Sequence, residues 1–387
     1  MKETFDPAVS RRAREITPFL VMDILERAHE LEREGKRVIH LEIGEPDFDT
    51  PDCVKEAAKK AIDDGKTHYT HSLGLIELRQ AISEHYQREF GVSPDPGRIV
   101  VTGGVSPAML LTFAALLHHG DEVILSDPSY ACYPNFIRFL GATPAYVPVR
   151  EKDGFQFTIK GLAPHITDKT RAIVANSPSN PAGTVTPPET LKALCNLGPT
   201  LVSDEIYQGL IYEGKGHSAL EFSNDCFVLN GFSKLFAMTG WRLGYVIVPE
   251  KYLCVIQKLQ QNFFICAGSV AQWAGVAALR EAGEDVLRMR ATYARRRRFL
   301  IDGLKKLGFA IPVEPTGAFY VMVNAKHLGE NSLALAYDIL EKVHLGVTPG
   351  IDFGPGGEGH LRFSYANSVE NIEEGLARLK TYLELRG

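Results

Sequence analysis

Short β-rich runs alternate with helical stretches between residues 99 and 250, and this alternation constrains the fold more than any other feature of the chain. The expected strands are 99–102, 122–126, 144–147, 172–176, 201–204, 227–230 and 244–248, and the expected helices are 107–118, 131–140 and 187–196. Such alternation is typical of a mainly parallel sheet covered by helices on both faces. We therefore predict an α/β fold whose large domain holds a mainly parallel, seven-stranded-type sheet.

The pattern changes outside this region. The further expected helices are 17–33, 51–64, 74–89, 285–307, 333–343 and 369–385, with short strands at 38–43, 318–323 and 360–364. The mixture beyond residue 307 is typical of a smaller α+β domain. A chain of 387 residues exceeds the roughly 250–300 at which a single core stops growing. We therefore predict a large domain at 45–290 and a small domain formed by 1–44 and 291–387.

Charge and composition favour small-molecule chemistry. The formal net charge is -5, so there is no basic surplus to bind nucleic acid or a bilayer. The run Arg295–Arg298 lies in an expected helix, where a solvated or inter-element face explains it. Residues 1–14 lack the apolar segment of a signal peptide, and no apolar stretch approaches the roughly 20 residues that span a membrane. The six cysteines form no CxxC pair, so we expect reduced thiols, no metal and a cytoplasmic location.

Lys234 is the strongest candidate for a reactive group. It follows the expected strand 227–230 in the segment Asn230-Gly-Phe-Ser-Lys-Leu-Phe-Ala-Met-Thr-Gly-Trp-Arg-Leu-Gly-Tyr245. Ligands of open α/β sheets bind beyond the carboxyl ends of the strands. Burial there lowers the pKa of an ammonium group toward the range in which the neutral amine forms a Schiff base. Arg242 can offer a bidentate fork to a phosphate dianion.

Several stretches, taken in order, resemble one family. Ser-Lys-x-Phe-Ala-Met-Thr-Gly-Trp-Arg-x-Gly-Tyr is similar to the cofactor-lysine motif of fold-type I aminotransferases of class I/II, the aspartate aminotransferase superfamily. The other matching stretches are Gly44-Glu45-Pro46-Asp47-Phe48, Asn180-Pro181-Ala182-Gly183-Thr184, Asp204-Glu205-Ile206-Tyr207 and Leu361-Arg362-Phe363-Ser364-Tyr365. They span about residues 15 to 385. The resemblance implies the cofactor pyridoxal 5'-phosphate (PLP), held by Lys234 as a Schiff base.

The resemblance assigns roles around the cofactor ring and the substrate. Asp204 would pair with the protonated pyridine nitrogen, and Tyr207 would donate to the phenolate oxygen. Asn180 would contact both the phenolate oxygen and the substrate carboxylate, and Arg362 would clamp that carboxylate. Gly44 would admit the carboxylate close to its backbone amide, because it has no side chain.

The phosphate of the cofactor needs further donors. The segment Thr102-Gly103-Gly104-Val105-Ser106 follows a strand and opens a helix, so its free amides can form an anion site. The resemblance places the phosphate on Gly104, Val105 and Ser106, and stacks Tyr130 on the pyridine. Tyr69 would reach the phosphate of the neighbouring subunit, which implies a homodimer with shared active sites.

Two features depart from the family pattern. Gly231 stands where many members have a phosphate-binding serine; either Ser233 compensates or the cradle is weaker. Val105 and Pro107 make the phosphate loop less polar than is common. The segment Gly354-Pro-Gly-Gly-Glu-Gly359 fits the GxGxxG dinucleotide fingerprint, but it precedes a strand instead of joining a strand to a helix. We interpret it as a glycine turn.

The expected activity is a ping-pong transfer of an amino group from an L-amino acid to a 2-oxo acid, with 2-oxoglutarate or pyruvate as the acceptor. Lys234, Asp204 and Tyr207 are the expected catalytic residues. A PLP-dependent C–S β-lyase or a cyclopropane-forming synthase of the same fold is the alternative. A PLP-binding regulator would need an added DNA-binding segment, for which residues 1–16 are too short. The sequence identifies no unambiguous arginine for a second substrate carboxylate: Arg11, Arg12 and Arg14 are candidates, with a surface charge as the alternative for each, so aspartate, alanine, aromatic and branched donors all remain open.

Overall fold

A seven-stranded sheet forms the centre of the protein in a computed structural model that describes residues 8–311 and 313–386. Its spatial order is β2-β8-β7-β6-β5-β3-β4, and of these strands β8 runs antiparallel to its neighbours. The strands are β2 (Ile99–Thr102), β3 (Glu122–Asp127), β4 (Thr143–Pro148), β5 (Thr170–Asn176), β6 (Thr200–Asp204), β7 (Phe227–Gly231) and β8 (Gly244–Ile247). The predicted mainly parallel sheet is confirmed.

Helices cover both faces of this sheet, because successive residues of a strand point to opposite sides. Val100 and Val246 lie on the face that packs against α5 (Val105–Leu116), α6 (Tyr133–Phe139) and α9 (Glu250–Phe263). Val101 and Ile247 lie on the face that packs against α3 (Asp52–Asp63), α4 (Ile76–Phe90), α8 (Pro188–Leu194) and α10 (Ser269–Glu281). The sequence pattern predicts no helix over 250–281, where the structure forms α9 and α10.

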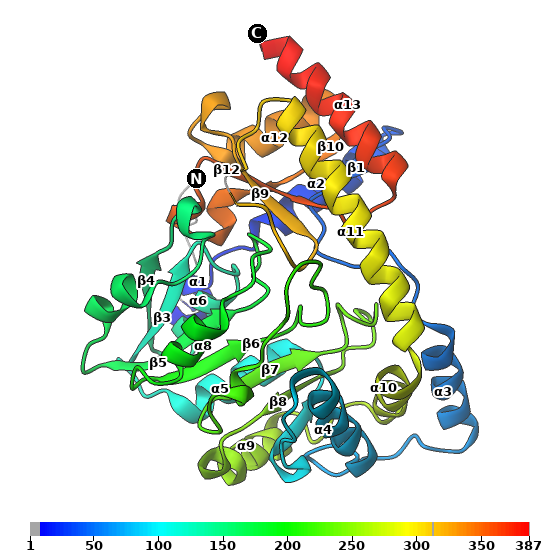
Figure 1. The fold of residues 1–387 in the computed structure, drawn as a ribbon, viewed down its shortest axis with the longest axis vertical. Coiled ribbons are helices and arrows are strands. Elements are labelled where there is room, and N and C mark those ends of the chain that lie inside the picture. The colour runs from blue at the N-terminus through cyan, green and yellow to red at the C-terminus, as the bar shows by residue number, and fades with distance from the viewer. Residues whose placement is uncertain (1–7, 312, 387) are drawn as a thin grey trace.

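Smaller sheets lie beyond one end of the large sheet (Figure 1). An antiparallel sheet has the order β11-β12-β9, and β1 pairs in parallel with β10. The strands are β1 (Ile39–His40), β9 (Tyr320–Asn324), β10 (Leu345–Gly346), β11 (Thr348–Pro349) and β12 (His360–Ser364). The helices of this region are α2 (Leu20–Arg33), α12 (Ser332–Val343) and α13 (Val369–Arg386). We call it the small-sheet region.

The long helix α11 (Gly283–Lys306) runs from the large-sheet region into the small-sheet region (Figure 1). Its arginine run is divided between solvent and protein: Arg295 and Arg298 are exposed, whereas Arg296 and Arg297 are buried. Arg296 forms an ion pair with Asp47 at 2.8 Å, and Arg297 pairs with Glu213. The run therefore combines a solvated side with contacts to other elements, as expected for a solvated or inter-element helix face.

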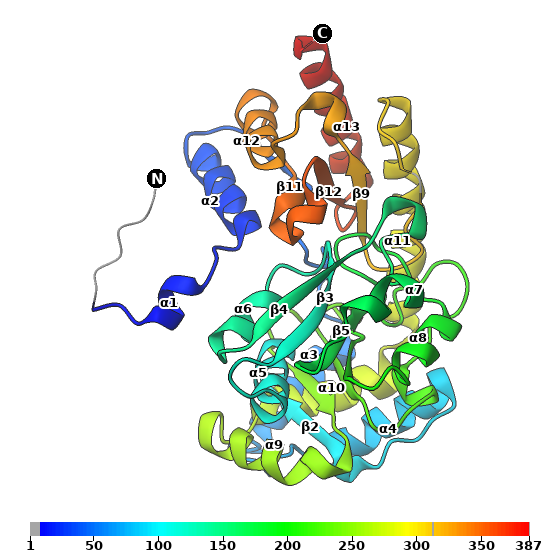
Figure 2. The same cartoon turned by 90° about the vertical axis from the view of Figure 1, so that its left-hand side faces the viewer.

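The N-terminal segment crosses from one region to the other (Figure 2). The short helix α1 (Arg11–Glu15) contacts α6 of the large-sheet region, and α2 packs on α12 in the small-sheet region. Residues 1–7, part of the segment judged not to be a signal peptide, lie outside the described residues. Within the described residues, no helix combines the length and the apolar character needed to cross a bilayer.

The glycine-rich segment 354–359 forms a turn between β11 and β12. Pro355–Gly357 is a 3-10 turn, and the Gly356 amide donates to Asp127 Oδ1 at 2.7 Å. The segment lies before a strand and packs on the end of β3, so the interpretation as a glycine turn is confirmed. The strands that matter most for a site are β2, β5, β6 and β7, which end at Thr102, Asn176, Asp204 and Gly231.

Candidate active site

A cavity of about 390 Å³ opens where these strand ends face the small-sheet region. Of the residues predicted from the sequence, those that line it are Gly44, Val105, Ser106, Tyr130, Asn180, Asp204, Tyr207, Ser233, Lys234, Arg242 and Arg362. Gly104 lies directly behind Arg242. Tyr69 does not line the cavity, and its side chain is 82% exposed. The structure thus brings together segments that are up to about 300 residues apart in the sequence.

Lys234 follows β7 and points into this cavity. Its Nζ donates to the carbonyl oxygen of Gly44 at 2.7 Å. Burial lowers the pKa of Lys234 to about 8, and the positive charges of Arg362 and Arg242 act in the same direction, while Glu45 opposes them. A lysine with this pKa holds a substantial neutral fraction near pH 8, so it can attack an aldehyde.

Asp204 ends β6 and is 3% exposed. Its Oδ2 accepts from the Tyr133 hydroxyl at 2.6 Å, and its Oδ1 accepts from the Ile206 amide at 3.1 Å. Burial raises the pKa of Asp204 to about 6. No cation forms an ion pair with Asp204 among the described residues. A buried carboxylate in this state is best stabilised by a cationic group that enters the cavity, such as a protonated pyridine nitrogen.

Tyr207 lies one turn beyond Asp204, and its hydroxyl is 2.9 Å from the hydroxyl of Tyr320. Both side chains are almost fully buried. Burial raises the pKa of Tyr207 well above its ordinary value, so the phenol keeps its proton. Tyr207 can therefore donate one hydrogen bond to an oxygen in the cavity while it accepts another from Tyr320.

Arg362 lies in β12 on the opposite side of the cavity and is 2% exposed. Its Nη1 donates to Asn180 Oδ1 at 3.0 Å, and its Nη2 donates to Thr348 Oγ1 at 3.0 Å and to the Glu42 carbonyl oxygen. These three bonds leave two of the five N–H donors of a guanidinium group free, and the buried Nε is one of them. A substrate carboxylate is a suitable acceptor for a buried, unpaired and charged donor.

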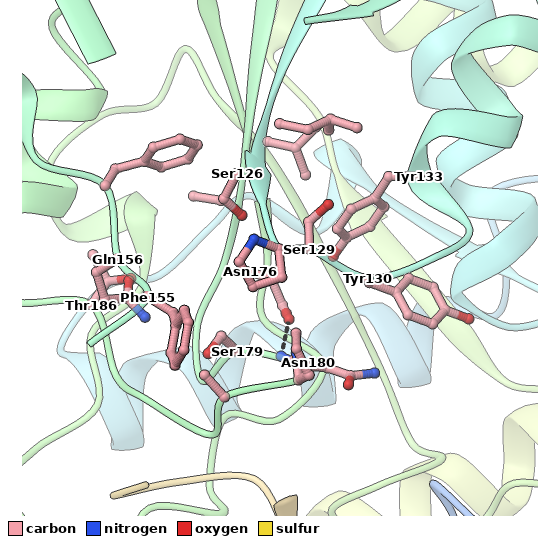
Figure 3. A pocket seen from close by; sticks show the side chains of 17 residues that line it. Ser126, Ser129, Tyr130, Tyr133, Phe155, Gln156, Asn176, Ser179, Asn180 and Thr186 are labelled. Atoms are coloured by element: carbon pink, nitrogen blue, oxygen red, sulfur yellow. Dashed lines mark hydrogen bonds between the residues drawn. The ribbon is translucent and has the colours of Figure 1, made fainter. Parts of the chain in front are cut away.

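Asn180 is held in place from the large-sheet side. Its backbone amide donates to Asn176 Oδ1 at 2.8 Å, as the dashed line in Figure 3 shows. Figure 3 shows a neighbouring pocket that shares Tyr130, Tyr133, Asn176 and Asn180 with the cavity. Tyr130 and Tyr133 lie on its other side, and their rings meet edge to face with centroids 5.3 Å apart. Asn176 therefore orients Asn180, which in turn accepts from Arg362.

The loop between β2 and α5 forms a cradle for an anion. Gly104 has a φ angle of 104°, and a Cβ atom there would lie 2.6 Å from Arg242 Nη2. Only glycine therefore allows the arginine to approach this backbone. Among residues 8–311 and 313–386, no side chain caps the N-terminus of α5, so its first amides can bind a phosphate beside Arg242.

The departure at Gly231 has a packing reason. A Cβ there would lie 3.0 Å from the Leu243 carbonyl oxygen and 3.2 Å from Val105 Cγ2, so a serine would displace its neighbours. Ser233, in contrast, lines the cavity. Compensation by Ser233 and a weaker cradle therefore both stay predictions.

Sequence reasoning missed several residues that line the cavity; those whose side chains bond to predicted site residues are Tyr133, Asn176 and Tyr320. Asn176 ends a predicted strand, so the rule that ligands bind at strand ends could have identified it. Tyr133 and Tyr320 lie in a helix and in a small-sheet strand, and no local signal separates them from ordinary core tyrosines. Only the packing places them against Asp204 and Tyr207.

The fold and the cavity together define a PLP enzyme of fold type I. The residues fit this cofactor: Lys234 can bind its aldehyde, buried Asp204 its ring nitrogen, and the Gly104 cradle with Arg242 its phosphate. Residues 36–379 match the family model described as aminotransferase class I and II. The chain belongs to the class I and II aminotransferases, which use PLP.

Similar proteins agree with this family. The chain is 44% identical to the (5-formylfuran-3-yl)methyl phosphate transaminase of Methanocaldococcus jannaschii, with 97% of this chain and 99% of the relative covered. It is 39% identical to the aspartate/prephenate aminotransferase of Thermus thermophilus, with 97% and 98% covered. The crystal structure of Thermus thermophilus aspartate aminotransferase with maleate has a TM-score of 0.93 at 38% identity, with 97% and 100% covered. The protein is an aminotransferase.

Proposed function

We propose that this aminotransferase transfers the amino group of an L-amino acid to 2-oxoglutarate or pyruvate in two half-reactions within the cavity. The buried group Lys234 carries this proposal, because its lowered pKa and its position make it both a nucleophile and a base. Bound PLP supplies an electron-withdrawing ring that acidifies the Cα–H bond of the substrate. The side chains of the protein then control orientation and proton transfer.

Arg362 binds the α-carboxylate of the substrate through its two free N–H donors. Asn180 contacts the same carboxylate group. Because Arg362 is fixed by three hydrogen bonds, the carboxylate is held at one place and the Cα–H bond faces Lys234. The Cζ atom of Arg362 lies 4.2 Å from the centre of the Tyr320 ring and 5.1 Å from the centre of the Phe353 ring, and these contacts restrict the guanidinium group further.

Lys234 Nζ removes the proton from the substrate Cα. Within the part of the chain that the structure describes, its one hydrogen bond is to the Gly44 carbonyl oxygen, so the amine can move toward the substrate without breaking an ion pair. Asp204 would hold the proton on the ring nitrogen of bound PLP, and Tyr133 keeps Asp204 in position. Tyr207 would donate to the phenolate oxygen of PLP, and the hydrogen bond between the Tyr207 and Tyr320 hydroxyls leaves Tyr207 free to do so when Tyr320 is the donor.

We propose the domain division 45–290 and 1–44 with 291–387, in which α11 crosses the boundary. We also propose a cytoplasmic homodimer with shared active sites. Tyr69, Phe263 and Ile265 are 82%, 60% and 49% exposed, and we propose that they lie in this interface. Tyr69 would then reach the phosphate of the neighbouring active site.

The test compares formation of 2-oxo acid with and without an acceptor. A panel of twenty amino acids is incubated with the holoenzyme, with 2-oxoglutarate or pyruvate present or absent. Product that forms only with acceptor supports the transfer reaction. Equal product without acceptor would identify the C–S β-lyase alternative, because β-elimination releases a 2-oxo acid and ammonia without an acceptor. A cyclopropane-forming synthase would release no 2-oxo acid under either condition. The names of the similar proteins favour neither alternative.

A further inference from the structure

The three cationic side chains that line the cavity already have partners in the proposed reaction. Lys234 binds the aldehyde of the cofactor, Arg242 its phosphate and Arg362 the substrate α-carboxylate. None is left among the described lining residues for a second carboxylate on the substrate side chain. An aspartate or glutamate side chain would therefore enter this cavity without a counter-charge from its own chain, which is costly for a buried ion.

The outer wall of the cavity is apolar. It is formed by Phe19, Val21, Met22 and Leu25 at the start of α2, and by Ile43 in the segment that follows β1. Met22 is 51% exposed, and the Phe19 ring contacts the Tyr130 ring edge to face at 6.1 Å. Tyr130 is the residue expected to stack on the cofactor, so the wall begins directly beside the reaction centre.

This wall is held in position by anchors at both sides. Asp352 Oδ1 accepts from the Leu20 amide at 2.8 Å and its Oδ2 from the Val21 amide at 3.3 Å, so Asp352 caps α2, which has no side-chain cap of its own. The Thr17 hydroxyl donates to Asn135 Oδ1 in α6 at 3.0 Å. The apolar residues are therefore presented to the cavity by a fixed helix start.

The remaining charge at the rim is negative. Glu45 lines the cavity, is exposed, and forms no ion pair within the described residues; it accepts a hydrogen bond from Thr239. A substrate with a negative side chain would meet this carboxylate at the entrance. Burial of apolar side chains against the wall and repulsion by Glu45 therefore both favour substrates whose side chains are apolar and uncharged.

We propose that the cavity selects amino donors with large apolar side chains, aromatic or aliphatic, over aspartate and glutamate. This inference rests on the proposed transaminase reaction and names its donor class. The side chain of such a donor packs against Phe19, Met22 and Leu25, while its α-carboxylate binds Arg362.

The experiment measures kcat/KM of the holoenzyme for phenylalanine, leucine, methionine, aspartate and glutamate, with pyruvate as acceptor. We expect the three apolar donors to exceed both acidic donors by at least about tenfold. Aspartate equal to or better than phenylalanine would overturn the inference, and would indicate that the neighbouring subunit supplies a cation. Absence of transfer from any of the twenty amino acids to pyruvate or 2-oxoglutarate would instead overturn the proposed function.

Two variants locate the selection on this wall. Met22→Lys places a cation at an exposed position of the wall, and we expect it to raise kcat/KM for aspartate about tenfold relative to phenylalanine. Leu385→Lys adds the same charge at an exposed site on α13 and should leave the ratio unchanged. Leu25→Ala should lower kcat/KM for phenylalanine more than for alanine. The dissociation constant of phenylalanine, from the shift in cofactor absorbance, should rise in parallel. Unchanged ratios in both wall variants would exclude α2 as the determinant.

Discussion

The two sides of the cavity hold their key residues in opposite ways. On the large-sheet side, Lys234 has a single hydrogen bond, and burial shifts the pKa of both Lys234 and Asp204 toward neutrality. On the small-sheet side, Arg362 has three hydrogen bonds and lies between two aromatic rings. The comparison teaches that the reacting group is left free to move and to change its charge, whereas the recognition group is fixed in place and in charge.

Replacing the mobile group should have the largest effect. Lys234→Ala removes both the nucleophile and the base, so we expect kcat to fall by more than about 10⁴-fold, together with loss of the cofactor's visible absorbance band. Activity assays and absorption spectra of the purified variant measure both effects. Lys215→Ala, at an exposed lysine, serves as the control. A Lys234→Ala enzyme with normal turnover would contradict the assignment of Lys234 as the nucleophile and the base.

Replacing the fixed group should affect binding more than chemistry. Arg362→Lys keeps the charge but loses the fork of donors, so we expect KM for the amino donor to rise about 50-fold with a much smaller change in kcat. Steady-state kinetics separate the two parameters, and Arg280→Lys, a surface position paired with Glu84, is the matched control. If kcat fell by as large a factor as KM rose, Arg362 would contribute to the chemical step as much as to substrate binding, and the contrast with Lys234 would not hold.

The charge of Lys234 gives a pH test of the same contrast. Burial lowers the pKa of Lys234 to about 8, so below pH 8 the amine is mostly protonated and cannot attack an aldehyde. We expect cofactor-free protein to capture PLP about tenfold faster at pH 9 than at pH 7, as the neutral fraction rises. Stopped-flow absorbance measures the rate. A rate that instead kept rising about tenfold per pH unit up to pH 10 would show an ordinary lysine.

Tyr320 joins the two sides, and its hydroxyl should have the smallest effect. Tyr320→Phe keeps the ring beside Arg362 but removes the bond to Tyr207, which weakens Tyr207 as a donor. We expect kcat to fall about fivefold and the pH midpoint of the cofactor absorbance to rise, while KM changes little. Tyr252→Phe, outside the cavity, should change none of these values. An unchanged pH midpoint in Tyr320→Phe would show that Tyr320 only packs.

The sequence by itself determined the large sheet and 11 of the 24 residues that line the cavity, mainly those with polar or charged side chains. Strand and helix periodicities are local; Asp204 ends a recognisable strand, and the loops that carry Asn180 and Lys234 follow recognisable strands. The chemistry was predicted from the ordered motifs, whose resemblance to class I/II aminotransferases implied PLP on Lys234, because a lone lysine at a strand end is usually a solvated surface group.

Only the tertiary structure decided how these residues work on one another. The bonds of Arg362 to Asn180 and of Tyr207 to Tyr320 join residues 182 and 113 positions apart, and no periodicity encodes such pairs. The apolar wall of α2 and its cap by Asp352 likewise depend on how the small-sheet region packs over the large sheet. Burial and long-range contacts set pKa values and free donors, and both arise only when distant segments meet.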